Sequence, residues 1–229
     1  LVGDLGQPAA RLAKDLPASA WEPQEVKALK AHMRATATVL ADGTITPTLL
    51  AQTACAALPP GARVTVDAGA HMLPVLAFYE AANPHDALMS RGLATMAYGL
   101  PTGIGAALAD PGRPVVAFTG DGGLMMCAGE LATAAQTGCQ LTVVVFNDSA
   151  IAMIGVKQNQ RGFERQGMDY SASDFAQVAR GFGCAAIRVD DPARLDAALR
   201  EAFATKGPCL VDVAVDPATY QAQIRALRG

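Results

Sequence analysis

Two runs of the sequence are apolar almost throughout, and a helical segment separates them. They are residues 115–118 (Val-Val-Ala-Phe) and residues 141–146 (Leu-Thr-Val-Val-Val-Phe). Strands of this composition have both faces covered, which is typical of parallel sheets enclosed by helices. These two runs therefore predict the centre of a buried, mainly parallel sheet.

Shorter strand-like runs alternate with helical runs on either side of these two. We expect six strands, at residues 63–67, 87–90, 114–119, 141–146, 185–189 and 209–215. The helical segments expected between them are residues 73–81, 100–109, 125–137, 151–158, 174–182 and 192–204. This alternation predicts an α/β fold: a doubly wound, mainly parallel six-stranded sheet with helices on both faces.

The N-terminal part differs in composition from the rest. Residues 7–43 are rich in Pro and Ala with mixed charge, and they contain one short helical stretch near residues 25–33, as expected of a linker. The opening Leu1-Val-Gly-Asp-Leu reads as the end of a preceding domain. We therefore expect residues 1–43 to be the tail of a central domain plus a linker, and residues 44–229 to be the main domain.

The composition excludes several classes of function. Hydrophobic residues make up 51% and charged residues 17% of the chain, which favours an ordered domain with a large core. The net charge of −3 argues against nucleic-acid binding, which calls for a basic stripe. No apolar run approaches the roughly 20 residues that a membrane span needs. The five cysteines are scattered without a Cys-x-x-Cys pair, so we expect reduced thiols in a cytoplasmic protein.

Glycine-rich or polar turns follow four of the expected strands. They are Asp67-Ala68-Gly69-Ala70-His71, Arg91-Gly92-Leu93-Ala94-Thr95-Met96, Gly120-Asp121-Gly122-Gly123 and Asn147-Asp148-Ser149. Ligands of open parallel sheets bind at the carboxyl ends of the strands. Small residues let backbone N–H groups approach anionic oxygens, and helix N-termini add a favourable dipole. We therefore predict that these turns form a cradle for a diphosphate.

Asp121 and Asn147 stand at the tips of two strands that should be neighbours. A carboxylate, a side-chain amide and a backbone carbonyl are hard oxygen ligands, which suit Mg²⁺ or Ca²⁺ rather than Zn²⁺. The two side chains predict a site for a hard cation at this edge of the sheet.

The sequence around Asp121 resembles the signature of thiamine-diphosphate enzymes. That signature runs Gly-Asp-Gly, a spacer and Asn-Asn; here Gly120-Asp121-Gly122 is followed by a 24-residue spacer, residues 123–146, and then Asn147. The resemblance implies that Mg²⁺ is bound by the side chains of Asp121 and Asn147 and by the backbone oxygen of Ser149. It also implies a thiamine-diphosphate-binding fold, with cofactor contacts from Gly120, Asp121, Gly122, Gly123, Asn147, Ser149, Ala150 and Ile151.

Two further segments extend the resemblance to the acetolactate synthase-like branch of that family, over about residues 44–215. Gly92-Leu93-Ala94-Thr95-Met96-Ala97-Tyr98-Gly99-Leu100-Pro101 is similar to that branch's Gly-Leu-Gly-Thr-Met-Gly-Tyr-Gly-Leu-Pro. It implies that Met96 is the catalytic wedge under the cofactor, and that the Met96 N–H and the Ala94 carbonyl bind its pyrimidine. Ala68-Gly69-Ala70-His71 resembles Val-Gly-Gln-His, the family's first diphosphate loop, which implies that His71 contacts phosphate.

Three positions depart from the family pattern. Asp148 stands where the second Asn is usual, Ala70 replaces a Gln near the cofactor, and Lys157 occupies the place of a substrate-sensing Trp in the biosynthetic acetohydroxyacid synthases. The change at Lys157 leaves the biosynthetic assignment open, and Asp148-Ser149 is closer to the catabolic acetolactate synthases. The residues expected to face the substrate are Met153, Ile154 and Lys157.

The resemblance implies an enzyme that uses thiamine diphosphate and Mg²⁺ to decarboxylate a small-molecule 2-oxo acid and join the product to a second carbonyl compound. The activating glutamate is expected on the pyrimidine-binding domain of a partner subunit. We therefore expect this chain alone to be inactive and the whole protein to be a homodimer or homotetramer. FAD binding by the full-length protein stays open.

Three alternatives remain at this point. One is a simple decarboxylase of the benzoylformate or oxalyl-CoA type. Another is a non-catalytic scaffold that keeps the fold, against which the intact Asp121 and Asn147 argue. The last is a nicotinamide-binding Rossmann module, because Gly103-Ile-Gly105 matches part of a dinucleotide fingerprint, although no strand directly precedes it.

Overall fold

The computed structural model describes residues 6–228, and the chain divides into two compact units, Leu1–Ala35 and Thr36–Gly229. The N-terminal region contains α1 (Gly6–Asp15) and α2 (Pro23–Ala37). The linker prediction missed α1 and gave only the middle of α2. Pro8 and Pro23 lie in the first turns of these helices, where proline is tolerated, and Pro17 lies between them, so strong helix formers prevail. The expected end of a preceding domain at Leu1-Val-Gly-Asp-Leu lies outside the described residues. The proposed boundary at residues 43 and 44 stays a prediction.

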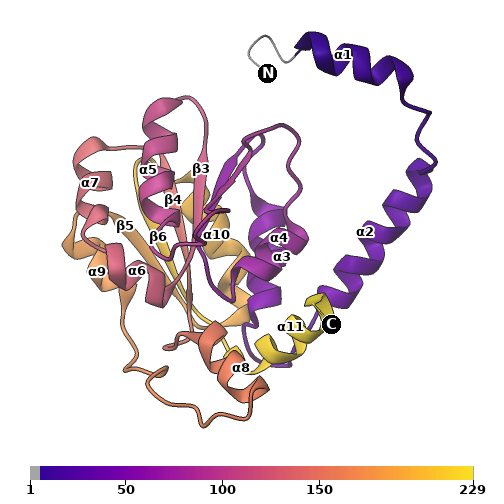
Figure 1. Cartoon of the computed structure of the whole chain (residues 1–229). Coiled ribbons are helices and arrows are strands. Elements are labelled where there is room, and N and C mark those ends of the chain that lie inside the picture. Colours follow the sequence, from indigo (N-terminus) through magenta and orange to yellow (C-terminus); the bar gives the residue numbers. More distant parts are fainter. Residues whose placement is uncertain (1–5, 229) are drawn as a thin grey trace. The chain divides into compact units, whose positions relative to one another are not determined.

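A six-stranded parallel sheet forms the centre of the larger unit (Figure 1). Its strands lie in the order β2-β1-β3-β4-β6-β5, and every pairing is parallel. Their bounds are β1 Arg63–Val66, β2 Ala87–Met89, β3 Val115–Gly120, β4 Leu141–Asn147, β5 Ala185–Val189 and β6 Cys209–Ala214. The predicted doubly wound α/β fold is confirmed, and all the expected strands are present within a residue or two of their expected ends.

Alternate residues of the central strands face opposite layers of helices. On one face, Phe118 and Phe146 belong to a buried cluster. That cluster includes residues of α3 (Pro47–Ala57), α4 (Met72–Phe78) and α10 (Leu195–Ala204). On the other face, Ala117 and Val145 belong to a second cluster. The helices of that layer are α5 (Gly99–Ala109), α6 (Asp121–Cys127), α7 (Glu130–Thr137) and α9 (Phe175–Gly181).

Two helical features differ from the sequence prediction. The segment expected as one helix at residues 125–137 forms α6 and α7, with Ala128 and Gly129 between them. α6 starts directly after β3, so that Asp121 is its first residue and its carboxylate lies at a helix N-terminus, where a negative charge is favourable. A helix that was not predicted, α11 (Tyr220–Arg228), follows β6 through a short 3₁₀ turn, Pro217–Thr219.

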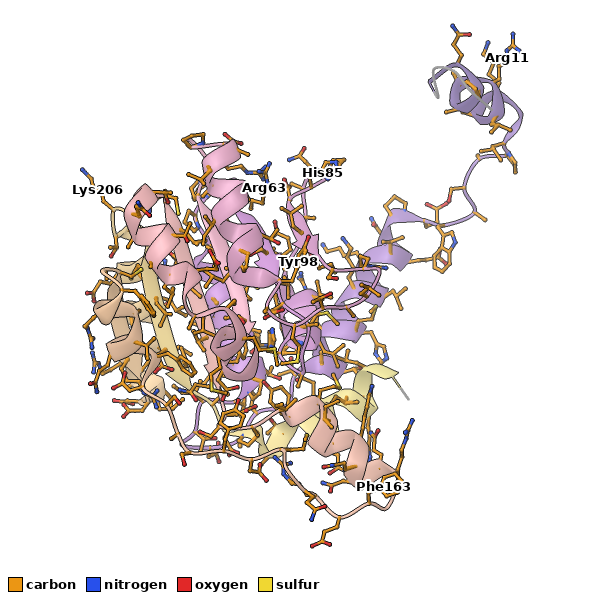
Figure 2. All side chains as sticks on the ribbon, turned by 60° about the vertical axis from the view of Figure 1, so that its left-hand side comes forward. Arg11, Arg63, His85, Tyr98, Phe163 and Lys206 are labelled. Atoms are coloured by element: carbon orange, nitrogen blue, oxygen red, sulfur yellow. The ribbon has the colours of Figure 1, made fainter. Side chains whose placement is uncertain are left out.

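The amino and carboxyl ends of the strands lie at opposite ends of this unit. Arg63 starts β1, and His85 and Lys206 precede β2 and β6; all three lie at the upper end in Figure 2. Phe163 follows α8 (Ala152–Gln160) and lies at the lower end. The carboxyl ends of the strands, where the sequence predicts a ligand site, therefore face the end that carries α8.

The partial dinucleotide fingerprint lies inside a helix and not at a strand-to-helix turn. Gly103 and Gly105 are interior residues of α5. A Cβ on Gly103 would lie 3.0 Å from Leu141 Cδ1 and 3.2 Å from Thr65 Oγ1, whereas nothing lies within 4 Å of a Cβ on Gly105. Gly103 thus allows α5 to approach the sheet closely, which is a packing role. The glycine motif on which the nicotinamide-binding alternative rested is therefore not a dinucleotide-binding turn.

We predict that Gly103→Val lowers the free energy of unfolding by about 1–3 kcal/mol, because the larger side chain overpacks the contact between α5 and the sheet. Gly105→Val is the matched control, with the same chemical change on the exposed side of the same helix. Urea unfolding of the two variants measures the difference. Equal loss of stability in both would contradict the packing role.

Candidate cofactor-binding site

A cavity of about 280 Å³ lies at the carboxyl ends of β1, β3 and β4. Its walls come from the turns after these strands, from the 94–96 turn, from α8 and from α11. The lining residues are Ala68, Gly69, Ala70, His71, Met72, Ala94, Met96, Gly120, Asp121, Gly122, Gly123, Phe146, Asp148, Ala150, Ile151, Ala152, Met153, Ile154, Lys157 and Tyr220. The cavity thus gathers all the predicted site residues except Asn147 and Ser149.

His71 forms the inner wall of the cavity behind the first turn. Its ring is 5.4 Å from that of Phe146, and Cβ atoms on Gly69 and Gly120 would lie only 2.7 and 3.1 Å from it. Burial lowers the pKa of His71 to about 4, although Asp67 opposes the shift, so the ring is neutral near pH 7. Its buried Nε2 has no hydrogen-bond partner among the described residues, which leaves it for a ligand.

Asp67 directly follows β1, and its role has no signal in the sequence pattern. It is fully buried, and its carboxylate accepts hydrogen bonds from the backbone N–H groups of Ala68, Ala97 and Tyr98 and from the Thr119 hydroxyl, at 2.9–3.1 Å. Asp67 therefore ties the turn that carries Met96 to the ends of β1 and β3.

The turn around Met96 has a strained backbone. Ala94 and Ala97 have φ angles of 50° and 63°, which residues with a side chain rarely adopt. The two hydrogen bonds from Ala97 and Tyr98 to Asp67 hold this conformation in place. The methyl carbon of Met96 lies 3.5 Å from the position of a Cβ on Gly122. Met96 therefore reaches across the cavity towards the 120–123 turn.

Asp121 and Asp148 form an acidic pair in the cavity. Asp121 accepts hydrogen bonds from Gly122 N (2.8 Å) and Ser149 N (2.6 Å), and Asp148 accepts one from Ala150 N (3.0 Å). Burial raises the pKa of Asp121. Burial, and next the charge of Asp121, raise the pKa of Asp148 to about 7. Two buried carboxylates that destabilise each other's charge fit a site for a divalent cation.

Asn147 lies outside the cavity because of the alternation along β4. Its side chain shares the face of Val145, where its Nδ2 donates to Asp212 Oδ1 (2.8 Å) and to Ser173 O (2.9 Å). The fully buried Asp212 also accepts from Phe175 N and is paired with Arg188. Both amide hydrogens of Asn147 thus fasten the start of α9 to the sheet.

Ser149 is held by bonds on both sides of its backbone. It has a φ of 59°, its N–H donates to Asp121, and its carbonyl oxygen accepts from Tyr170 N at 3.0 Å. Among the described residues, no three His, Cys, Asp or Glu side chains gather into a metal site. A cation at the acidic pair would therefore draw its other ligands from backbone, cofactor and water oxygens.

Tyr170 was not anticipated from the sequence. An isolated bridge between Ala150 and Asp169 aligns its segment with the turn after β4. Its hydroxyl lies beside Asp121, and a Cβ on Gly122 would be 3.3 Å from it. The hydroxyl is buried and meets no partner at hydrogen-bond geometry among the described residues. The local pattern around Tyr170 gives no signal, because only the pairing with residues 149–151 brings it to the site.

The helix α8 supplies the outer wall of the cavity. Met153, Ile154 and Lys157 line it, with Lys157 one turn beyond Met153 and exposed. Arg165, which pairs with Asp169, lies against Gly155, where a Cβ would be 2.6 Å from its guanidinium. The predicted substrate-facing residues therefore share the cavity with the acidic pair.

The fold and the cavity define a class of proteins that bind an anionic cofactor at the carboxyl ends of a doubly wound sheet. Residues 67–213 match the family described as thiamine pyrophosphate enzyme, C-terminal TPP binding domain. The chain therefore belongs to the thiamine pyrophosphate enzymes and contains their C-terminal cofactor-binding domain.

Comparison with curated proteins identifies acetolactate synthases as relatives. Identity is 33% over 153 residues with the acetolactate synthase of Bacillus subtilis (67% of this chain, 27% of the relative). It is 37% over 166 residues with the isozyme 1 large subunit of Escherichia coli (70% and 29%). It is 34% over 154 residues with the mitochondrial catalytic subunit of Saccharomyces cerevisiae (67% and 22%). The chain thus spans less than a third of the length of these relatives.

All five cysteines are free. No helix among the described residues is long and apolar enough to cross a membrane.

We predict that Gly123→Ala weakens binding of thiamine diphosphate in the presence of Mg²⁺ by at least about tenfold. The reason is steric: the added Cβ would overlap Asp67 Oδ2 and lie 3.2 Å from Thr119 Oγ1, so the network that holds the turns must shift. Gly129→Ala is the control, because nothing lies within 4 Å of a Cβ there. Isothermal calorimetry measures both affinities, and equal affinities would contradict the role given to the Asp67 network.

Proposed function

We propose that the chain is the cofactor-binding domain of an acetolactate synthase-like enzyme. It would use thiamine diphosphate and Mg²⁺ to decarboxylate a 2-oxo acid and join the acyl unit to a second carbonyl compound. The observation that carries this proposal is one cavity that combines the acidic pair, Asp121 and Asp148, with Met96 and the glycine-rich turns. The acidic pair suits a cation, the turns offer N–H groups to a diphosphate, and Met96 supports an organic ring.

Asp121 and Asp148 are the proposed side-chain ligands of the Mg²⁺ ion. The family motif assigns Asn147, which would bind the ion through Oδ1. Its Nδ2 donates to Asp212 and Ser173 on the other face of the strand, and Asn147 does not line the cavity. Asp148 lines the cavity beside Asp121. The Ser149 carbonyl keeps a second lone pair beside its bond from Tyr170, and it stays the proposed backbone ligand.

Thiamine diphosphate, when bound, supplies an electron sink for the carbanion that decarboxylation leaves. The residues of this chain bind and orient it in the proposal. The 69–71 turn and the 120–123 turn hold the diphosphate, and the neutral His71, in the tautomer with its proton on Nε2, would donate to a phosphoryl oxygen. Met96 supports the organic part, with the strained backbone at Ala94 beside its pyrimidine.

The side of the cavity that carries α8 is proposed to receive the substrate. Met153 and Ile154 are apolar and would exclude water from the reacting atoms. Lys157 would attract a substrate that carries a second negative charge. A simple decarboxylase would use the same cavity, because the two reactions differ only in what accepts the acyl unit.

The remaining parts of the enzyme are proposals for the whole protein. They are an activating glutamate on the pyrimidine-binding domain of a partner subunit, a homodimeric or homotetrameric assembly, and FAD binding by a central domain. A cytoplasmic location stays a prediction that rests on the scattered, free cysteines. With the glutamate elsewhere, residues 1–229 alone should bind the cofactor without catalysing decarboxylation.

We predict that Asp148→Ala weakens Mg²⁺-dependent binding of thiamine diphosphate by about 100-fold, because a ligand position of the ion is left empty. Asp121→Ala should have an effect of similar size. Asn147→Ala should instead lower the free energy of unfolding by about 1–3 kcal/mol, through the lost bonds to Asp212 and Ser173, and leave the dependence on Mg²⁺ in place.

Calorimetry with Mg²⁺ or with EDTA, together with urea unfolding, measures these effects. Asp110→Ala, at the C-terminal end of α5 on the other edge of the sheet, is the control for loss of a carboxylate. A loss of Mg²⁺ dependence in Asn147→Ala with normal binding in Asp148→Ala would return the ligand role to Asn147.

For the full-length enzyme, we predict that Lys157→Met lowers kcat/KM for a dicarboxylic 2-oxo acid relative to pyruvate by about tenfold. Methionine keeps the length of the side chain and removes its charge, so the change isolates the electrostatic contribution. Lys206→Met, at the opposite end of the domain (Figure 2), is the matched control. An unchanged ratio in Lys157→Met would leave substrate choice to other parts of the enzyme.

A further inference from the structure

Tyr220, the first residue of α11, reaches the cofactor cavity from the C-terminal end of the chain. Its side chain is 1% exposed and lines the cavity. Its ring belongs to a small apolar cluster with Ala70 of the first turn and Ala152 of α8. In Figure 1, α11 lies beside α8, and it also contacts α4. Small residues at 70 and 152 thus leave the space that this large ring fills.

The position of Tyr220 is fixed by bonds on both sides of it. Before it, Val215 N donates to Asn147 O, Asp216 N donates to Ile45 O, and the Asp216 side chain caps the 3₁₀ turn through Ala218 N at 2.9 Å. After it, the buried Gln223 Nε2 donates to Thr48 Oγ1 (2.7 Å) and to Ala37 O (3.2 Å). The register of α11 is therefore set, and Tyr220 is held against the cavity.

Tyr220 is almost completely buried and lines the cavity, so a ligand bound there would share the surroundings of its hydroxyl. The hydroxyl of a buried tyrosine usually finds a hydrogen-bond partner, and a ligand in the cavity can supply one. Burial, together with the charges of Asp148 and Asp121, raises the pKa of Tyr220 well above its usual range. The phenol therefore stays neutral and keeps its proton to donate.

We propose that the Tyr220 hydroxyl donates a hydrogen bond to a phosphoryl oxygen of the bound diphosphate. This inference rests on the proposed function. The ring packs on Ala70, within the turn that would hold the diphosphate, and its electrostatic neighbours are the two carboxylates that would hold the cation. An oxygen bound next to a cation between Asp121 and Asp148 carries negative charge, and a neutral phenol is a suitable donor to it. The C-terminal helix thereby becomes part of the cofactor site.

The test is Tyr220→Phe in the whole chain, which removes the hydroxyl and keeps the ring that packs on Ala70 and Ala152. Calorimetry with Mg²⁺ measures the affinity for thiamine diphosphate and, separately, for inorganic diphosphate. Both affinities should fall by about tenfold, the size expected for one hydrogen bond to a charged group. The melting temperature without ligand should stay within a few degrees of wild type, because the packing is preserved.

Tyr79→Phe is the matched control. Its hydroxyl donates to Asp86 O at 3.1 Å and lies near Ala62 O, at the amino ends of the strands and away from the cavity, so its loss should leave both affinities unchanged. Wild-type affinity for inorganic diphosphate in Tyr220→Phe overturns the inference. Failure of the wild-type chain to bind either probe with Mg²⁺ would overturn the proposed function instead.

Discussion

The carboxylate of Asp67 is the contact on which the geometry of this domain most depends. Its oxygens accept hydrogen bonds from three backbone N–H groups and one hydroxyl. Asp67 is fully buried and directly follows β1, which lies next to β3 in the sheet. A buried charge persists only when its oxygens are satisfied. The turn that carries Met96 must therefore take one conformation, even with Ala94 and Ala97 in the left-handed region.

The same carboxylate explains the choice of glycine in the neighbouring turn. Gly123 has no room for a Cβ, because Asp67 and Thr119 occupy that space. Similarly, the ring of His71 excludes a side chain at Gly69 and crowds Gly120. These glycines are required by the buried side chains of Asp67, His71 and Thr119, which approach the turns closely. The glycines of the sequence motifs are thus explained by close packing beneath the cavity.

The sheet could be predicted because period and composition are local properties. The same properties predict where β3 and β4 end. Because the two strands are parallel neighbours, they also predict that Asp121 lies near the turn after β4. The motif spacing alone, however, did not distinguish the two faces of a strand. Asn147 follows Leu141, Val143 and Val145 at intervals of two, so its side chain lies on the face of α9, while Asp148 is free to turn into the cavity. The period-two rule, applied one residue further, places Asp148 on the opposite face, which agrees with the proposal that Asp148 is a ligand.

Tyr170 and Tyr220 could not be predicted from local pattern, because each is placed by a contact between distant segments. Tyr170 depends on the bridge to Ala150, and Tyr220 depends on the anchoring of α11 by Gln223. Both phenols are neutral and lie near Asp121 and Asp148. These two side chains therefore do not neutralise the negative charge of the acidic pair. A pair of buried carboxylates in such a setting favours either a proton or a divalent cation between them. Binding of Mg²⁺ and binding of the diphosphate should therefore depend on each other. The ion reduces the repulsion between the carboxylates and the diphosphate, and the diphosphate supplies further negative charge to the ion.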